Sequence, residues 1–185
     1  MDGSTRTRMT PWVARLLGAN ALVYLVFATV LTAPGLAAVL GFQPAQSGAR
    51  PWTFFSYPFL HEGLANLAVT SALIWAFGPT LERRLGSRVL LVYYLYCGVG
   101  AALFAMLVSL LYSVPPLVGA SAPVLGLAVA WAFEHTDREL TIPPLPYPVR
   151  APTLVAGLVA AVGVTAIVLW DSAFHPANLG GAAAG

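Results

Sequence analysis

Residues 89–133 read VLLVYYLYCGVGAALFAMLVSLLYSVPPLVGASAPVLGLAVAWAF and contain no charged residue. A helix needs about 20 predominantly apolar residues to cross the roughly 30 Å hydrocarbon core of a bilayer, so this stretch is too long for one crossing. It is interrupted at Ser113–Pro116, where two consecutive prolines remove backbone donors and disfavour helix. The sequence therefore predicts two membrane helices here, at residues 89–112 and 119–133.

Four further apolar segments complete the predicted set of membrane helices, at residues 16–33, 59–81, 151–170 and 172–185. The first follows arginines, as the apolar part of a signal peptide does, but it is longer than that part usually is and more apolar segments follow, which favours a retained helix. The helix at 119–133 is short, so we expect it to begin below the membrane surface, inside protein or a water-filled cavity. The last segment is too short for a crossing, so we expect a truncated sixth helix.

Composition predicts the same class of protein. Of 185 residues, 58% are hydrophobic and 9% are charged, with a mean hydropathy of +0.78, whereas soluble domains carry about 25% charged residues. We therefore expect an all-α polytopic membrane bundle of six helices in the lipid bilayer, forming a single domain over residues 1–185. A net charge of +2 is too small for a nucleic-acid-binding surface, so nucleic acid is excluded as the main partner. The single cysteine, Cys97, excludes a disulfide framework.

The distribution of arginine predicts the orientation of the bundle. If the amino terminus is cytoplasmic, every arginine except Arg50 falls on the cytoplasmic side, as the positive-inside rule requires. The proline-rich segment 134–150 is then a cytoplasmic connector with extended character. Glu82, beside Arg83 and Arg84, is interpreted as part of an anchor at this surface or as a local cap. We expect a multi-pass protein of the cell membrane.

Polar residues gather at the opposite side of the predicted bundle. His61 and Glu62 lie at the start of the second helix, Ser121 at the start of the fourth, and His175 and Asn178 at the start of the sixth. Strongly polar groups in a membrane cost several kcal/mol unless they are paired or hydrated. A group of them at one depth therefore predicts a functional site.

Short motifs occur in order along the predicted helices: FLHEGLAN at 59–66, FG at 77–78, ERRLG at 82–86, GASA at 119–122, and NLGG at 178–181 with Gly185. With these motifs the sequence resembles the rhomboid family of intramembrane serine proteases. The resemblance implies a six-helix bundle with a water-filled cavity that opens outward, a serine nucleophile at its base and a histidine base on the sixth helix. It also implies that the partners are transmembrane segments of membrane-anchored proteins, which such enzymes cleave.

The resemblance assigns a role to each residue that matches a motif. Ser121 takes the position of the nucleophile, although Ala122 stands where a glycine usually follows. Asn178 stands where the family has its catalytic histidine, and Asn66 and Thr70 stand where it usually has a histidine and an asparagine that support the oxyanion. An asparagine amide has no useful proton affinity near neutral pH, so it can orient a serine but cannot activate it. We expect a serine endopeptidase of weak or lost activity, or alternatively an inactive protein that binds transmembrane segments.

Other roles are open for several of these residues. Ser121 suits the N-cap of its helix, with Pro123 in the first turn. His61 is grouped with the oxyanion support, although at a helix start it suits a hydrogen-bonded structural role better. His175 precedes Asn178 by three residues, about 60° and about 4.5 Å away on a continuous helix, and is a second candidate for the base.

We expect no metal and no other cofactor, because no pair of ligands has helical spacing. A transporter finds little support, because no charged pair lies inside a helix.

Overall fold

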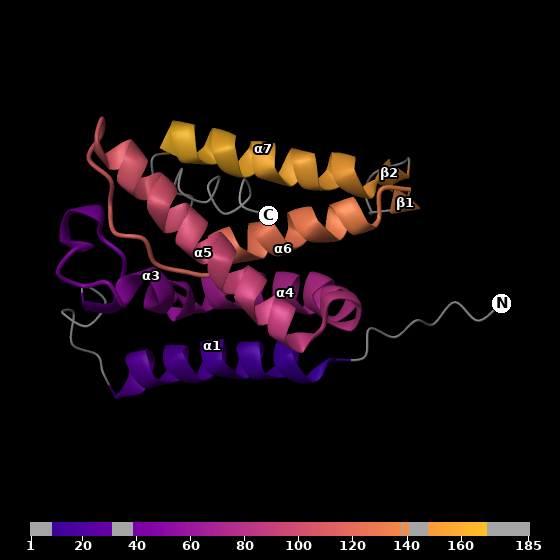
Figure 1. The fold of residues 1–185 in the computed structure, drawn as a ribbon, viewed down its shortest axis with the longest axis horizontal. Helices are drawn as coiled ribbons and strands as arrows, with labels where there is room; N and C mark the ends of the chain where they lie inside the picture. Colours follow the sequence, from indigo (N-terminus) through magenta and orange to yellow (C-terminus); the bar gives the residue numbers. More distant parts are fainter. Residues whose placement is uncertain (1–8, 31–38, 138, 141–147, 170–185) are drawn as a thin grey trace.

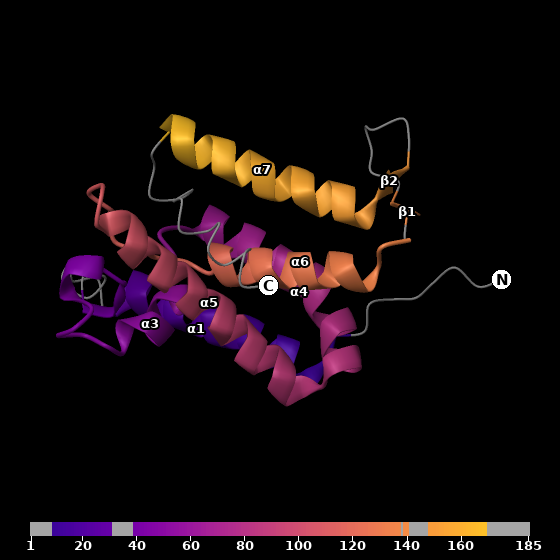
Figure 2. The same cartoon turned by 45° about the horizontal axis from the view of Figure 1, so that its top comes forward.

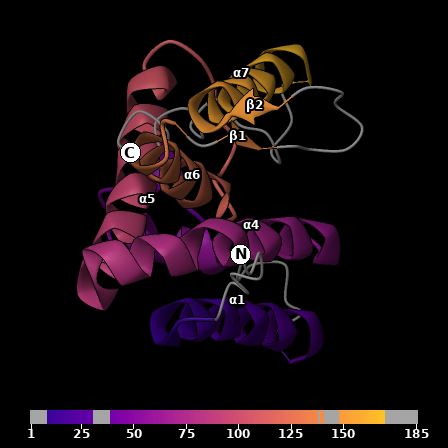
Figure 3. The same cartoon turned by 90° about the vertical axis from the view of Figure 1, so that its right-hand side faces the viewer.

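The computed structural model describes residues 9–30, 39–137, 139–140 and 148–169. Helices α1 (Pro11–Thr29), α4 (Leu64–Leu85), α6 (Ser121–Glu134) and α7 (Ala151–Leu169) pack in that order, and α5 (Ser87–Ser109) crosses them obliquely (Figure 1). Helix α6 lies between α5 and α7 (Figure 2). Helices α1 and α4 lie one above the other on the side of the bundle away from α7 (Figure 3).

Short elements connect these helices. The segment between α1 and α4 holds η1 (Pro44–Gln46), α3 (Thr53–Ser56) and η2 (Tyr57–Phe59). Between α6 and α7, β1 (Glu139–Leu140) pairs antiparallel with β2 (Val149–Arg150), with Glu139 opposite Arg150. The ends of the connector predicted at 134–150 therefore include a short ladder, and its residues 141–147 lie outside the described part of the chain.

Helices α1, α4 and α5 are long and apolar enough to cross a membrane. Their 19, 22 and 23 residues extend about 28, 33 and 35 Å at a rise of about 1.5 Å per residue. Their outer surfaces carry large exposed apolar side chains, among them Leu22, Leu25, Val92, Leu103 and Leu107. Such surfaces suit contact with lipid, and they confirm the predicted all-α membrane bundle.

Helix α6 is the central element of the bundle. It has 14 residues and extends about 21 Å, which is less than the hydrocarbon core. Most of its side chains are buried, because α4, α5 and α7 all pack against it. Its last residue, Glu134, forms an ion pair with Arg84 near the end of α4. Since α4 is about 12 Å longer than α6, the start of α6 lies well inside the bundle.

Five of the six helices predicted from the sequence are present in the described part of the chain, but several ends differ. Helix α1 begins at Pro11 rather than at residue 16, and α4 begins at Leu64 rather than at residue 59. The later start of α4 follows from Pro58, which sits in the 3₁₀ turn η2, and from Gly63, whose backbone is extended. The predicted sixth helix at 172–185 lies outside the described residues.

A buried carboxylate explains the early start of α1. Glu82, in the last turn of α4, is 5% exposed. Its Oε1 accepts hydrogen bonds from the Trp12 N–H at 3.1 Å and the Ser87 hydroxyl at 2.8 Å, and its Oε2 accepts one from the Val13 N–H at 3.0 Å. These amides belong to the first turn of α1, which lacks intrahelical acceptors and favours a negative charge. Glu82 therefore caps α1 from a different helix, rather than capping locally.

The close approach of α1 and α4 requires glycine at position 78. A Cβ atom there would lie 2.7 Å from the Cγ2 of Val13. Val13 is fully buried and β-branched, so its side chain cannot rotate away freely. We expect Gly78→Ala to push α1 away from α4 and to lower the free energy of unfolding by about 1–3 kcal/mol. Unfolding in detergent, followed by circular dichroism, measures this loss.

Two further variants make this prediction specific. A Cβ atom at Gly18 meets no described atom within 4 Å, so Gly18→Ala is expected to unfold at or above the parent midpoint. Gly78→Ala combined with Val13→Ala is expected to lose less stability than the two single changes together, because the second change removes the clash. If Gly78→Ala unfolds as the parent does, α1 can move away from α4 without loss of stability, and close packing at Gly78 does not stabilise the bundle.

Candidate functional site

Ser121 is the first residue of α6. The residue before the helix is Ala120, whose carbonyl accepts the first helical hydrogen bond from the Val124 N–H at 3.0 Å. The expectation that Ser121 is the N-cap is therefore wrong by one position. The reason is that the turn formed by Gly119 and Ala120 makes Ala120 the N-cap, so the helix begins at Ser121 and not at Ala122. The amides of Ser121 and Ala122 precede that first bond, at the positive end of the helix dipole.

Gly119 shapes the chain immediately before this helix. Its φ of +111° lies in a region that side-chain-bearing residues rarely adopt. Its N–H donates to the carbonyl oxygen of Tyr57 at 3.0 Å. The hydroxyl of Tyr57, which is 2% exposed, donates in turn to the Gly98 carbonyl oxygen at 2.8 Å. The start of α6 is thus fixed to η2 and α5 at the same time.

The side chain of Asn66 lies against this turn. A Cβ atom at Gly119 would lie 3.6 Å from the Oδ1 of Asn66 and 3.9 Å from its Nδ2. The Oδ1 atom is buried and has no hydrogen-bond partner among the described residues. The structure therefore brings the amide of Asn66, from the first turn of α4, close to the backbone two residues before Ser121.

Thr70 lies one turn after Asn66 and contacts His61. Its Oγ1 lies 3.1 Å from the Nε2 of His61, 2.8 Å from the carbonyl oxygen of Asn66 and 3.2 Å from that of Leu67. The Nδ1 of His61 lies 3.2 Å from the carbonyl oxygen of Phe59. A carbonyl can only accept, so Nδ1 carries a proton, and the Nε2 of a neutral ring then accepts from Thr70. The Thr70 hydroxyl has a single proton, so His61 and the backbone carbonyls of α4 compete for it.

The environment of His61 favours the neutral ring. Burial lowers the pKa of His61, and the hydrogen bond to the Phe59 carbonyl opposes that shift without reversing it. Both ring nitrogens are engaged in this arrangement. His61 therefore holds the segment before α4 against Thr70.

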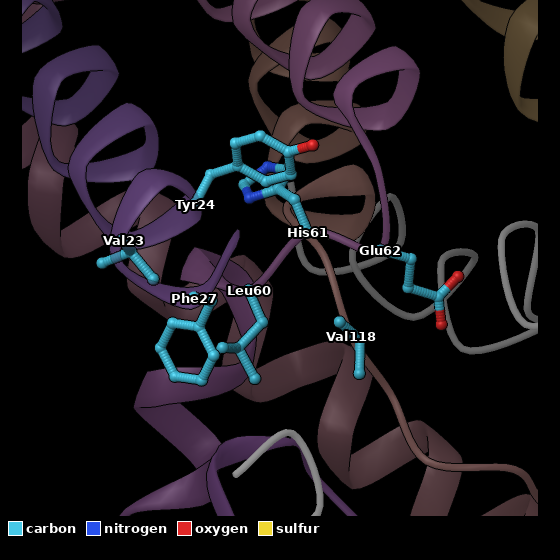
Figure 4. Close-up of a pocket in the computed structure, with 7 residues that line it drawn as sticks. All are labelled: Val23, Tyr24, Phe27, Leu60, His61, Glu62 and Val118. Carbon is cyan, nitrogen blue, oxygen red and sulfur yellow. The ribbon is translucent and has the colours of Figure 1, made fainter. Parts of the chain in front are cut away.

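A pocket of about 130 Å³ lies on another side of His61, between α1 and the segments that precede α4 and α6. In Figure 4 the ring of Tyr24 lies beside that of His61, and the carboxylate of Glu62 points away from the apolar residues. Cavities of about 150 Å³ hold a benzene molecule, so this pocket fits one apolar side chain. Its lining consists of Val23, Tyr24, Phe27, Leu60, His61, Glu62 and Val118.

Sequence reasoning found part of this arrangement. The motifs and the resemblance selected Asn66, Thr70 and Ser121. Of these, Asn66 lies against Gly119, two residues before Ser121, and Thr70 lies against His61. They did not select Tyr57, which joins η2 to α5 and to the start of α6, because its contacts are distant in the sequence. His175 and Asn178 lie outside the described residues. Among the residues that are described, no three histidine, cysteine, aspartate or glutamate side chains are grouped as metal ligands.

The described motifs fall within a region that matches a known family. The family model named Rhomboid domain matches residues 48–185, which include α4, α6 and α7. The chain belongs to the rhomboid family. RHOMBOID-like protein 9, chloroplastic, of Arabidopsis thaliana is 27% identical to this rhomboid-family chain over 88 residues. That alignment covers 48% of the chain and 19% of the relative, so the chain matches about a fifth of the relative's length.

Proposed function

We propose that this rhomboid-family protein binds transmembrane segments of membrane-anchored proteins at a serine site that has lost its base. In this proposal Ser121 takes the nucleophile position and Asn178 replaces the histidine that would accept its proton. The protein then cleaves bound segments slowly or not at all. The second candidate function is a working serine endopeptidase that uses His175 as the base.

The observation that carries the proposal is the position of Asn66 beside Gly119, two residues before Ser121. A side-chain amide N–H and the first backbone N–H groups of a helix are groups that can stabilise an oxyanion. The Asn66 amide and the start of α6 together support the oxyanion side of such a site. Thr70 contributes less, because its single hydroxyl proton is already directed to His61 or to a backbone carbonyl of α4.

The base has no comparable support among the described residues. His61 uses both ring nitrogens, toward Phe59 and Thr70. His135 follows the last residue of α6, about 21 Å from its start, and bonds to the carbonyl oxygen of Trp131 at 2.8 Å. Without a base, a serine hydroxyl stays protonated and is a weak nucleophile. Binding therefore accounts for the described site better than cleavage does.

A reactive-serine probe tests the catalytic half of the proposal. We expect Ser121 to react with a fluorophosphonate no faster than the background measured for Ser121→Ala. The physical reason is that the amide of Asn178, which takes the position of the base in this proposal, cannot remove the hydroxyl proton during attack. Labelling is followed by intact-protein mass spectrometry on the protein in detergent. Rapid labelling of the parent, lost in both Ser121→Ala and His175→Ala, would overturn the proposal in favour of the endopeptidase.

The binding half is tested with a defined peptide. A photoreactive side chain at Phe27, which lines the pocket, is expected to cross-link to a synthetic single-pass transmembrane peptide in the same vesicles. The control carries the same group at Leu103, which is exposed on α5. Equal cross-linking at the two positions indicates random collision in the bilayer and contradicts a binding site at the pocket.

A further inference from the structure

A pair of polar side chains lies in the buried core of the bundle. Asn20 on α1 and Tyr94 on α5 are both 0% exposed. Asn20 follows Val13 and Leu16 at helical spacing on the buried face of α1, so an amide occupies a position where an apolar side chain is expected. A buried amide without hydrogen bonds costs free energy, and a membrane offers it no other partner. Asn20 therefore needs a polar partner inside the bundle.

The described residues do not supply that partner directly. Neither the Oδ1 nor the Nδ2 of Asn20 makes a hydrogen bond to them, and neither does the hydroxyl of Tyr94. The hydroxyl nevertheless lies close enough to the side chain of Asn20 to interact with it. Where two polar groups interact without a direct hydrogen bond, a bridging water molecule can supply the bonds that are missing.

The positions of the two residues along their helices agree with a bridge between them. Glu82 accepts hydrogen bonds from the first turn of α1 and from Ser87, so α1 and α5 begin at the same end of the bundle. Asn20 lies about 14 Å along α1 and Tyr94 about 11 Å along α5 from that end, at a rise of about 1.5 Å per residue. The two helices also pack against each other. Both polar groups therefore lie at similar depths, well inside the membrane-spanning part of the bundle.

We propose that Asn20 and Tyr94 bind one internal water molecule that joins α1 to α5. The ligand must be small, because both side chains are fully enclosed. It must also donate and accept, because an amide carries both an acceptor oxygen and donor N–H groups, and a phenol can act in either way. Water meets both conditions, and buried waters typically make about three hydrogen bonds to such groups. Bound there, the water holds the face of α1 that carries Asn20 against α5.

Oxidation by hydroxyl radicals tests this proposal on the purified full-length chain in detergent. A short X-ray pulse converts water into radicals that oxidise the side chains beside it, and tandem mass spectrometry of the digested protein separates Tyr94 from Tyr93 and Tyr96. Tyr94 is expected to be oxidised although it is fully buried. The internal control is Tyr57, which is 2% exposed and donates directly to the Gly98 carbonyl oxygen, and it is expected to stay at background.

Two variants connect this signal to the amide of Asn20. Asn20→Leu keeps a side chain of similar size, but it removes a partner of a water that needs about two to four of them. Oxidation of Tyr94 is therefore expected to fall to the level of Tyr57. The control Thr29→Val removes an exposed hydroxyl from the same helix and is expected to leave the oxidation of Tyr94 unchanged.

Each other outcome overturns the proposal. If Tyr94 stays at background while the exposed Tyr112 is oxidised, no water lies between Asn20 and Tyr94. Equal oxidation of Tyr94 and Tyr57 indicates that water enters the core generally, and unchanged oxidation in Asn20→Leu removes the role of the amide. If Asn20→Leu fails to fold, the comparison of Tyr94 with Tyr57 in the parent decides.

Discussion

Replacing Glu82 by alanine is expected to lower the free energy of unfolding by about 3–5 kcal/mol. The change leaves the amides of Trp12 and Val13 and the hydroxyl of Ser87 without their shared acceptor inside the bundle. Hydrogen bonds to a charged group contribute about 1.5–3 kcal/mol each, and such losses at one site add incompletely. The positive end of the α1 dipole also loses its counter-charge. Titration with a denaturing detergent, followed by circular dichroism, measures the effect.

Two control variants distinguish the loss of the Glu82 cap on α1 from the general effect of removing a negative charge. Glu82→Gln keeps one carbonyl oxygen as an acceptor and is expected to lose about half as much stability. Glu134→Ala removes an acidic residue whose partner, Arg84, is 63% exposed, and surface pairs contribute about 0–1 kcal/mol. Its unfolding midpoint is expected to stay near that of the parent. If Glu82→Ala and Glu134→Ala unfold alike, Glu82 does not hold α1 in place.

The five membrane helices in the described part of the chain could be predicted, because each follows from a local property, the length of an uncharged apolar window. Their ends could not, since the ends depend on contacts between distant residues. Helix α1 extends back to Pro11 because Glu82, about 70 residues away, accepts the amides of its first turn. Helix α4 starts only at Leu64, because the 3₁₀ turn at Tyr57–Phe59 occupies the residues before it.

In the candidate site, too, some features could be predicted from the sequence and others could not. Asn66, Thr70 and Ser121 could be selected because they occupy family motifs. Their hydrogen bonds could not be predicted, since residue order does not determine where a hydroxyl proton is directed. The structure turns Thr70 toward His61 and the backbone of α4, and it sets Asn66 against Gly119. The motifs therefore selected Asn66 as a candidate, and the structure places it near the start of α6, but the hydrogen-bond partners of Thr70 are seen only in the structure.

Replacing Asn178 by histidine is expected to give the protein proteolytic activity. An imidazole at this position supplies the proton acceptor that the proposed site lacks. In a serine protease, loss of the histidine costs about 10⁶ in kcat, so a partial restoration is expected to raise cleavage by a factor on the order of 10³. The readouts are cleavage of a single-pass test substrate in vesicles and fluorophosphonate labelling of Ser121. Both must return to background when Ser121→Ala is added.

A second change is expected to increase this gain. Thr70→Asn introduces an amide donor, and one oxyanion donor contributes about 10²–10³ in kcat in a working protease. The increase is expected to be smaller here, about tenfold, because the substitution also removes the hydroxyl that bonds to His61. Asn178→His/Thr70→Asn is therefore expected to exceed Asn178→His, while Thr70→Asn alone stays inactive because it adds no base. If the double variant unfolds as the parent does and still cleaves nothing, the site lacks more than these two groups. A site that binds transmembrane segments and does not have the geometry of a protease then becomes the better explanation of Ser121 and its neighbours.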